Sequence, residues 1–174
     1  MNRAKKAELA AQAVYALKRC QFSYGKHVFI TGCDSLSIMI GAIAKNTGAA
    51  SVVLGVTDNE QEKKMKILGF DAYRYGMMDP LEMARKVTNK RMFDLIFETQ
   101  GTVEAYEVII KTVKRGGGVA IIGVLEKPLN CHVCDLIRDQ ICFYGIKGAD
   151  ESSRRIADML LNEGSLDYAV DAAG

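Results

Sequence analysis

Short, continuous apolar runs alternate with helical patterns along this chain, and this alternation limits its fold more than any other feature. The strand-like runs lie at 27–31, 51–56, 71–75, 93–97, 118–124 and 141–146. Helical patterns lie at 4–20, 36–45, 59–68, 79–90, 102–114 and 150–163. Continuous Val, Ile and Leu runs are typical of strands covered on both faces, and alternation with helices favours parallel pairing through right-handed crossovers. The pattern predicts an α/β fold: a doubly wound parallel six-stranded sheet, order 3-2-1-4-5-6, with helices on both faces.

The length of 174 residues fits one compact domain. Its only two prolines, Pro80 and Pro128, are placed at a helix start and in a loop, and no linker-like stretch is visible. We therefore expect a lead-in helix and loop at 1–25, followed by a single domain at 26–174.

Charge and composition exclude several classes of protein. The 23 Lys and Arg residues against 21 Asp and Glu give a net charge of +2, which provides no long-range field for nucleic acid or an anionic membrane. No apolar run is long enough for a membrane span, and residues 1–9 lack the apolar stretch of a signal peptide. The odd number of cysteines argues against a disulfide framework. We expect a cytoplasmic protein with reduced thiols and no nucleic-acid or membrane partner.

The turn after the first strand is the first candidate site. In a doubly wound sheet this turn faces the ligand crevice, and a dinucleotide-binding turn has the pattern GxGxxG, in which the glycines allow the backbone to approach the pyrophosphate. Gly32 provides the first glycine, whereas Asp34 and Ser37 occupy the second and third positions. Ser37 is small enough to be accommodated. Asp34 places a negative charge where the phosphates would lie.

Two interpretations of Asp34 remain open. If its carboxylate stood about 4 Å from a phosphate, the repulsion would reach roughly 4 kcal/mol at an effective dielectric of 20, an upper figure because the side chain can rotate away. Alternatively, Asp34 caps the following helix by accepting hydrogen bonds from first-turn N–H groups. In that case the anion site is filled by the protein's own carboxylate.

The end of the second strand is the place for an acidic residue that binds the adenosine ribose, about 20 to 25 residues after the first glycine. The strand ends at Val56, Thr57 and Asp58, and Asp58 comes slightly late. Asp58 is equally well placed to cap the helix that starts at Asn59. Thr57 with Lys63 or Lys64 would instead tolerate a 2′-phosphate, so NAD and NADP both remain open.

Two further groups of residues border the expected crevice or suggest chemistry. The sequence from Glu98 to Gly101 ends the fourth strand, and the glycines at 116–118 precede the fifth; we interpret these glycines mainly as turn residues. Cys131, His132 and Cys134 invite a metal or redox interpretation, but no second ligand pair completes a zinc site, and we favour ordinary packing. Cys33 follows Gly32, but the neighbouring Asp34 opposes a reactive thiolate.

Taken together, these segments resemble the cofactor-binding domain of the medium-chain dehydrogenase/reductase family, which includes the zinc-type alcohol, polyol and threonine dehydrogenases and quinone reductases. The resemblance runs from about Ala7 to Tyr168. It is carried by the order and spacing of YALKRCQFSYGKHVFITG, SLSIMIGAIAKNTGA, KMKILGFDA, FDLIFETQG, KRGGGVAIIGV, ICFYGIKGA and NEGSLD. It implies a Rossmann-like fold, NAD or NADP as the cofactor, and a homodimer formed through the sheet edge around 119–124 and 141–146.

The resemblance also assigns residues to the cofactor. The pyrophosphate turn would be 32–37, the ribose would face 56–58, the strand end at 99–102 would flank the adenine side, and 122–124 with Gly148 and Ala149 would lie along the nicotinamide. The cofactor-binding residues expected are Gly32, Cys33, Asp34, Ser35, Leu36, Ser37, Val56, Thr57, Asp58, Thr99, Gln100, Gly101, Ile122, Gly123 and Val124. A gapless comparison with the family places Val56 at the acidic position.

Family members carry a GroES-like catalytic domain ahead of the cofactor domain, and this chain begins at about that junction. We therefore expect no catalytic residues, no zinc and no turnover from this chain alone. The leading hypothesis is the NAD(P)-binding domain of a medium-chain oxidoreductase, in which the parent enzyme transfers hydride between nicotinamide and an alcohol or carbonyl. The alternatives are a degenerate pseudo-cofactor domain that acts as a dimerisation or structural module, and an adenosyl-methionine-type binder that uses the same turn.

Overall fold

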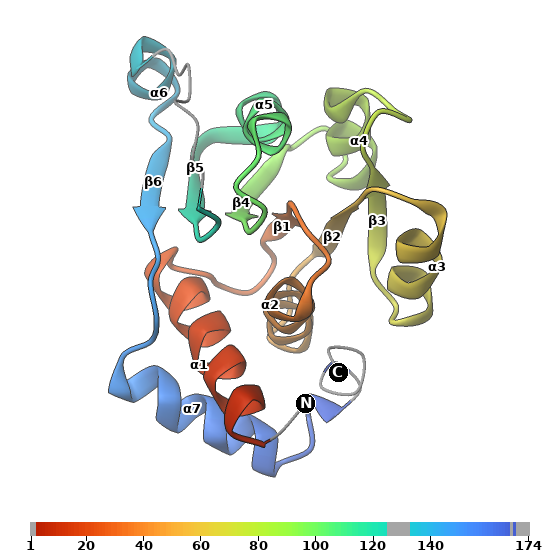
Figure 1. Ribbon diagram of the computed structural model, residues 1–174. Helices are drawn as coiled ribbons and strands as arrows, with labels where there is room; N and C mark the ends of the chain where they lie inside the picture. The colour runs from red at the N-terminus through yellow and green to blue at the C-terminus, as the bar shows by residue number, and fades with distance from the viewer. Residues whose placement is uncertain (1–2, 125–132, 168, 170–174) are drawn as a thin grey trace.

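The computed structural model describes residues 3–124, 133–167 and 169, and within them a single parallel sheet forms the centre of the molecule (Figure 1). The strand order is β3-β2-β1-β4-β5-β6, which confirms the expected order. The strands are β1 (His27–Ile30), β2 (Ser51–Val56), β3 (Asp71–Arg74), β4 (Phe93–Glu98), β5 (Val113–Ile121) and β6 (Cys142–Gly145).

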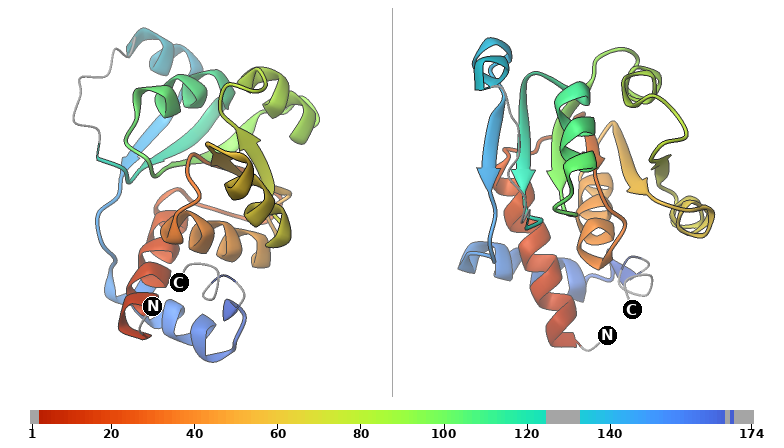
Figure 2. Two further views of the ribbon diagram at one scale, coloured as in Figure 1. Left: turned by 45° about the vertical axis from the view of Figure 1, so that its right-hand side comes forward. Right: turned by 45° about the horizontal axis from the view of Figure 1, so that its top comes forward.

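Helices cover both faces of this sheet, as the doubly wound pattern predicts (Figure 2). Helices α1, α2, α3 and α7 contribute to the core on one face, and α4 and α5 contribute to the core on the other. The helices are α1 (Arg3–Arg19), α2 (Ser35–Asn46), α3 (Asn59–Ile67), α4 (Pro80–Val87), α5 (Val103–Thr112), α6 (Val133–Asp139) and α7 (Glu151–Asn162).

The inner strands β1, β2 and β4 are buried on both faces because successive side chains enter different cores, whereas the edge strands β3 and β6 keep exposed positions. In β1, Val28 and Ile30 belong to the core under α1 and α2, whereas Phe29 belongs to the core under α4 and α5. In that second core, the Phe29 ring stacks on Phe93 with 5.4 Å between ring centroids. This double burial explains why the strands are continuous apolar runs rather than alternating ones.

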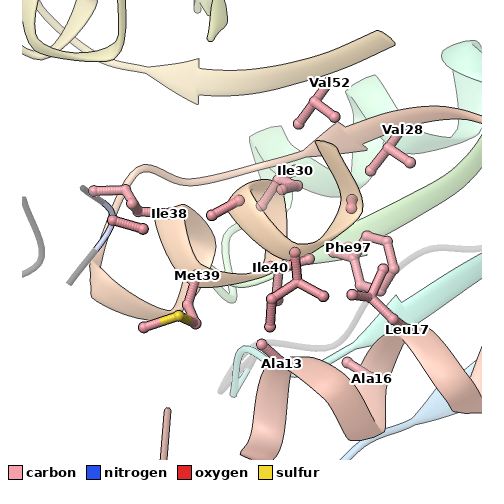
Figure 3. Packing of buried hydrophobic residues seen from close by; sticks show 14 of the residues in the cluster. Ala13, Ala16, Leu17, Val28, Ile30, Ile38, Met39, Ile40, Val52 and Phe97 are labelled. Carbon is pink, nitrogen blue, oxygen red and sulfur yellow. The ribbon is translucent and has the colours of Figure 1, made fainter. Parts of the chain in front are cut away.

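Helix α1 packs against α2 and α7 and is part of the larger core (Figure 3). Its small residues Ala13 and Ala16 are fully buried, and Leu17 lies near Ile40 of α2 and Phe97 of β4. Cys20, which follows the helix, is also buried, and desolvation raises the pKa of its thiol to about 12. This thiol is therefore a packing residue rather than a reactive group.

Several element boundaries differ from the sequence prediction: α4 ends at Val87 rather than at 90, and the largest difference is where α5 meets β5. Helix α5 ends at Thr112, not 114, and β5 begins at once at Val113 and ends at Ile121. The early start of β5 is possible because an irregularity opposite Phe93 and Leu95 accommodates extra residues, with Gly116 at a φ of +72°. Helix α6 was not predicted, because its seven residues are too few for an apolar periodicity to identify a helix.

Parallel pairing brings the carboxyl ends of the strands to one edge of the sheet. Ile30 of β1 is opposite Leu54 of β2 on one side and Phe97 of β4 on the other. Strand order reverses between β1 and β4, which is where doubly wound proteins bind ligands. Across the described ranges, no helix combines the length and apolar character that crossing a lipid bilayer would need.

Candidate functional site

A cavity of about 550 Å³ opens at the carboxyl edge of the sheet, over the point where strand order reverses. Its size falls in the range typical of small-molecule sites. It is bounded by the ends of β1, β2, β3 and β4 and by the start of α5. The lining residues are Gly32, Cys33, Asp34, Thr57, Tyr75, Thr99, Gln100, Thr102 and Glu104.

Gly32 and Ser37 let the ends of β1 and β4 approach closely. A Cβ atom on Gly32 would stand 2.7 Å from the Thr99 hydroxyl oxygen, so the first glycine of the turn is required by packing. Ser37, at the third glycine position, is fully buried, and its Oγ lies 2.8 Å from Thr99 Oγ1 in a hydrogen bond. The serine therefore ties α2 to the end of β4, a contact that glycine could not make.

Asp34 is the N-cap of α2. It is exposed, it has extended backbone, and its Oδ1 accepts a 2.8 Å hydrogen bond from the Ser37 amide. The helix-cap alternative is therefore confirmed. One first-turn N–H group that a phosphate would use already donates to a carboxylate of the protein itself.

The end of β2 offers a hydroxyl rather than an acid. Val56 is buried in the core, so its side chain does not reach the cavity. Asp58 caps α3 by accepting a 2.9 Å hydrogen bond from the Gln61 amide, which confirms the capping alternative there too. Thr57 lines the cavity, and both its amide and its hydroxyl donate to Gln61 Oε1, at 2.9 and 3.1 Å.

Sequence reasoning missed Tyr75 and Glu104 as lining residues. The Tyr75 hydroxyl donates a 2.8 Å hydrogen bond to the Thr31 carbonyl and so links β3 to β1 across β2. Burial raises the pKa of Tyr75 above its ordinary value, and the phenol remains a neutral donor. Its place directly after a strand is the signal that could have identified it. Glu104 lies in the first turn of α5, and no sequence motif marks it.

The remaining expected residues lie around the β4 and β5 ends rather than in the cavity wall. Gly101, Ile122, Gly123 and Val124 gather there, and the Glu98 carbonyl accepts hydrogen bonds from the Ile122 and Gly123 amides at 2.9 and 3.0 Å. Ser35 and Leu36 form the first turn of α2. The structure thus brings Gly32, Cys33, Asp34, Thr57, Thr99 and Gln100 together in one cavity and places the others behind or beside it.

The charges at the cavity are acidic. Asp34 and Glu104 contribute carboxylates, and none of its described lining residues is Lys or Arg. Desolvation, together with the charges of Asp34 and Asp58, raises the pKa of the Cys33 thiol. Cys33 is therefore protonated and a poor nucleophile. The hydroxyls of Thr57, Thr99 and Thr102 and the Gln100 amide are suited to hydrogen bonds with sugar and base rather than to covalent chemistry.

Among the residues that the structure describes, no three His, Cys, Asp or Glu side chains gather as a metal-ligand set would. Cys131 and His132 lie outside those residues, and Cys134 is exposed in α6. The expectation of no zinc in this chain stays a prediction.

Comparison with known proteins agrees with this geometry. A family model described as zinc-binding dehydrogenase matches residues 36–174. Sorbitol dehydrogenase from Bacillus subtilis is 30% identical over 91% of this chain and 49% of its own length. L-threonine 3-dehydrogenase from Streptomyces coelicolor is 27% identical over 86% of this chain and 44% of its own length. The chain spans about half the length of the curated relatives that it matches.

Solved structures show the same fold. An alcohol dehydrogenase from Thermotoga maritima superposes with a TM-score of 0.84 at 22% identity, over 94% of this chain and 47% of the other. A zinc-binding dehydrogenase from Sinorhizobium meliloti, bound to NADP, superposes with a TM-score of 0.82 at 22% identity, over 91% and 48%. The family model covers well over half of the chain, so the chain belongs to the zinc-binding dehydrogenase family and is an NAD(P)-binding domain of the medium-chain oxidoreductase type.

Proposed function

We propose that this chain binds NAD or NADP in the crevice between the ends of β1 and β4. The observation that supports this most is the cavity itself, which lies at the reversal of strand order and at the start of α2. Gly32, Cys33 and Asp34 of the turn after β1 line this cavity, where doubly wound proteins bind their ligands.

The residues present fit the sugar and base of a dinucleotide better than they fit its phosphates. Thr57 and Tyr75 line the cavity with hydroxyl groups that would suit the adenosine ribose, and Thr99, Gln100 and Thr102 line it on what would be the adenine side. Residues 122–124, beside the cavity, would lie along the nicotinamide. Residues 32–37 would hold the pyrophosphate by backbone N–H groups. Asp34 caps α2, and none of the described residues that line the cavity is Lys or Arg. We therefore propose that the phosphates are bound weakly.

For the whole protein, the family supports hydride transfer as the proposed activity. The bound cofactor supplies or accepts the hydride, and the parent enzyme would exchange it with an alcohol or a carbonyl compound. This chain would bind and orient the cofactor and would not turn over substrate alone. The chain has Val56 at the position where the family has an acidic residue that binds the ribose, and its cavity is acidic. Neither feature selects between NAD and NADP.

A homodimer in the cytoplasm is the proposed state of the protein. Strand β6 forms the edge of the sheet, and α6 beside it leaves Val133 and Ile137 62% and 73% exposed. An unpaired strand edge with apolar neighbours is suited to pairing with a second copy. The division into a lead-in segment at 1–25 and a domain at 26–174 also remains a proposal.

Calorimetric titration of NADH and NADPH tests the central proposal. We expect one saturable site per chain for at least one of the two cofactors, with a dissociation constant below about 1 mM. AMP should compete if the adenosine half occupies the crevice. If neither cofactor gave a binding signal up to that concentration, the result would contradict the proposal and would favour the degenerate, purely structural alternative.

A further inference from the structure

Glu98, the last residue of β4, connects three strand ends at the edge of the crevice. Its side chain is fully buried, and one carboxylate oxygen, Oε1, accepts hydrogen bonds from the Gln100 amide at 2.9 Å and the Gly101 amide at 2.7 Å. The Thr31 hydroxyl at the end of β1 donates to the same oxygen at 3.4 Å. The backbone carbonyl of Glu98 binds the turn after β5.

The other carboxylate oxygen, Oε2, is buried, and within the described part of the chain it has no hydrogen-bond partner. It faces Gly123, where a Cβ atom would stand only 2.6 Å away. The turns themselves are interlocked, because a Cβ on Gly101 would stand 2.4 Å from the Val124 carbonyl oxygen. Glu98 therefore stands at the centre of two turns that touch each other.

A buried carboxylate oxygen without a donor needs an explanation beyond packing. Valine or isoleucine would continue the apolar pattern of β4 at this position without burying an acid. What the carboxylate provides is an acceptor that fixes the amides of residues 100 and 101 in one geometry. Glutamine could supply the same acceptor oxygen, but it carries an NH2 group in place of Oε2 and, unlike the acid, it cannot ionise.

We propose that Glu98 is a positioning residue that holds the turns 99–101 and 122–124 against each other, and that its ionisation state changes how strongly these turns bind the cofactor. The part of this inference that concerns cofactor binding rests on the proposed function. The part that concerns the geometry of the turns does not. Glu98 is called a positioning residue rather than a catalytic one because its side chain is fully buried and does not line the cavity.

The surroundings of Glu98 favour its neutral form. Desolvation raises the pKa of Glu98, and the hydrogen bonds that its carboxylate accepts from Gly101, Gln100 and Thr31 oppose this rise without overcoming it. The titratable groups that face it are Tyr75 at the end of β3 and Tyr106 on α5, and both phenols have raised pKa values to which Glu98 contributes. Because Oε1 already accepts three donors, the proton belongs on Oε2.

The test follows backbone amides by NMR as a function of pH, in the wild type and in Glu98→Gln. We expect the Gly101 and Gly123 amide signals to titrate together in the wild type and to be flat in Glu98→Gln, with both amides still protected from hydrogen exchange. Glu107→Gln, which removes an exposed carboxylate from α5, is the matched control and should leave the titration unchanged. Glu98→Ala should lose the exchange protection at Gly101.

NADH titrations of the same proteins supply the functional part of the test. Affinity of the wild type should fall about threefold as Glu98 ionises, because a negative charge is added near an anionic ligand, and Glu98→Gln should remove this pH dependence. A Gly101 titration that survives in Glu98→Gln, or a pH dependence of affinity that survives in it, would overturn the inference. If the wild type bound no NADH, the proposed function would fail, whereas the amide titration would still decide the role of Glu98.

Discussion

At the scale of single residues, two side chains stand where a dinucleotide-binding turn has glycine, and they differ in consequence. Ser37 is buried and bonded to Thr99, so it strengthens the packing between α2 and β4. Asp34 is exposed and places a carboxylate at the N-terminus of α2. An anionic ligand would otherwise accept hydrogen bonds from the same N–H groups. The charge of Asp34 repels the ligand, and a substitution that removes this charge but keeps the cap can separate the two effects.

Asp34→Asn should raise the affinity for NADH without lowering stability. Asparagine caps helices about as well as aspartate, so the hydrogen bond to the Ser37 amide is retained while the charge is removed. We expect a gain of about tenfold, which is less than the unscreened limit because Asp34 is exposed. Fluorescence titration at constant ionic strength measures it.

The control for this variant is Asp79→Asn. Asp79 caps α4 in the same way but does not line the cavity, so its substitution should leave NADH affinity unchanged. An unchanged affinity in Asp34→Asn, or an equal gain in both variants, would show that Asp34 does not limit phosphate binding.

Glu98 should make the free energy of unfolding depend on pH. The pKa of Glu98 is raised in the folded protein from its ordinary value of 4.5, so the stabilising contribution of the neutral form is complete below 4.5. That contribution is lost as the pH rises through the folded-state value, by at most about 1.4 kcal/mol per pH unit. Wild type should therefore lose stability relative to Glu98→Gln as the pH is raised above 4.5.

Urea denaturation of wild type, Glu98→Gln and Glu107→Gln at several pH values checks this expectation. The difference between wild type and Glu107→Gln should not show the same trend, because Glu107 is exposed. Parallel stability curves for wild type and Glu98→Gln across the whole pH range would contradict the raised pKa.

At the scale of elements, the turns at the strand ends are fitted to each other by close approach. A Cβ on Gly123 would lie 2.4 Å from the Gly101 amide nitrogen, which belongs to the neighbouring turn. The backbone at Gly101 and Gly123 cannot move apart without breaking the hydrogen bonds around Glu98. The geometry of the cofactor side of the site thus depends on two glycines that the sequence motif does not mark as essential.

Gly123→Ala should destabilise the protein by about 1–3 kcal/mol, because the added methyl group overpacks backbone against backbone. Gly145→Ala in β6 is the control, since nothing stands within 4 Å of its Cβ position, and it should be close to neutral. Chemical denaturation of the two variants gives both values. Equal stability of the two variants would mean that the turns at 99–101 and 122–124 are not interlocked.

Elements with strong periodicity could be predicted from the sequence, and those without it could not. The strand order and the two-faced burial followed from the apolar runs, and the caps at Asp34 and Asp58 followed from residue type and position. Helix α6 was missed because its seven residues span too few turns to show a periodic pattern. Tyr75 was missed although its place directly after a strand marks it as a candidate. The role of Glu98 was missed because it arises from a contact with Thr31, 67 residues away, which no local pattern reveals.

At the scale of the whole molecule, the sheet leaves one edge strand, β6, beside a helix with exposed apolar side chains. The opposite end of the sheet order is β3, flanked by α3. The proposed dimer would use the first of these edges. It would leave the crevice between β1 and β4 open, since two strands separate β6 from β1 in the sheet.

Sedimentation analysis should give the mass of two chains for the wild type and of one chain for Ile137→Glu. The side chain is 73% exposed in the single chain, so the fold should tolerate the charge while an interface would not. Met159→Glu on α7, where Met159 is 61% exposed, is the matched control and should remain a dimer. A wild type that sediments as one chain at all concentrations would rule out the proposed assembly.

The most direct measurement of the central claim is a map of NADH binding by backbone amide chemical shifts. The account predicts saturable changes at residues 32–37, at Thr57 and at 99–101, which together line the carboxyl edge of the sheet. The opposite edge, where Lys26, Asp94 and Lys114 surround a smaller cavity, should be unaffected. Changes confined to that opposite edge, or no changes at millimolar NADH, would contradict the claim that the crevice between β1 and β4 binds a dinucleotide.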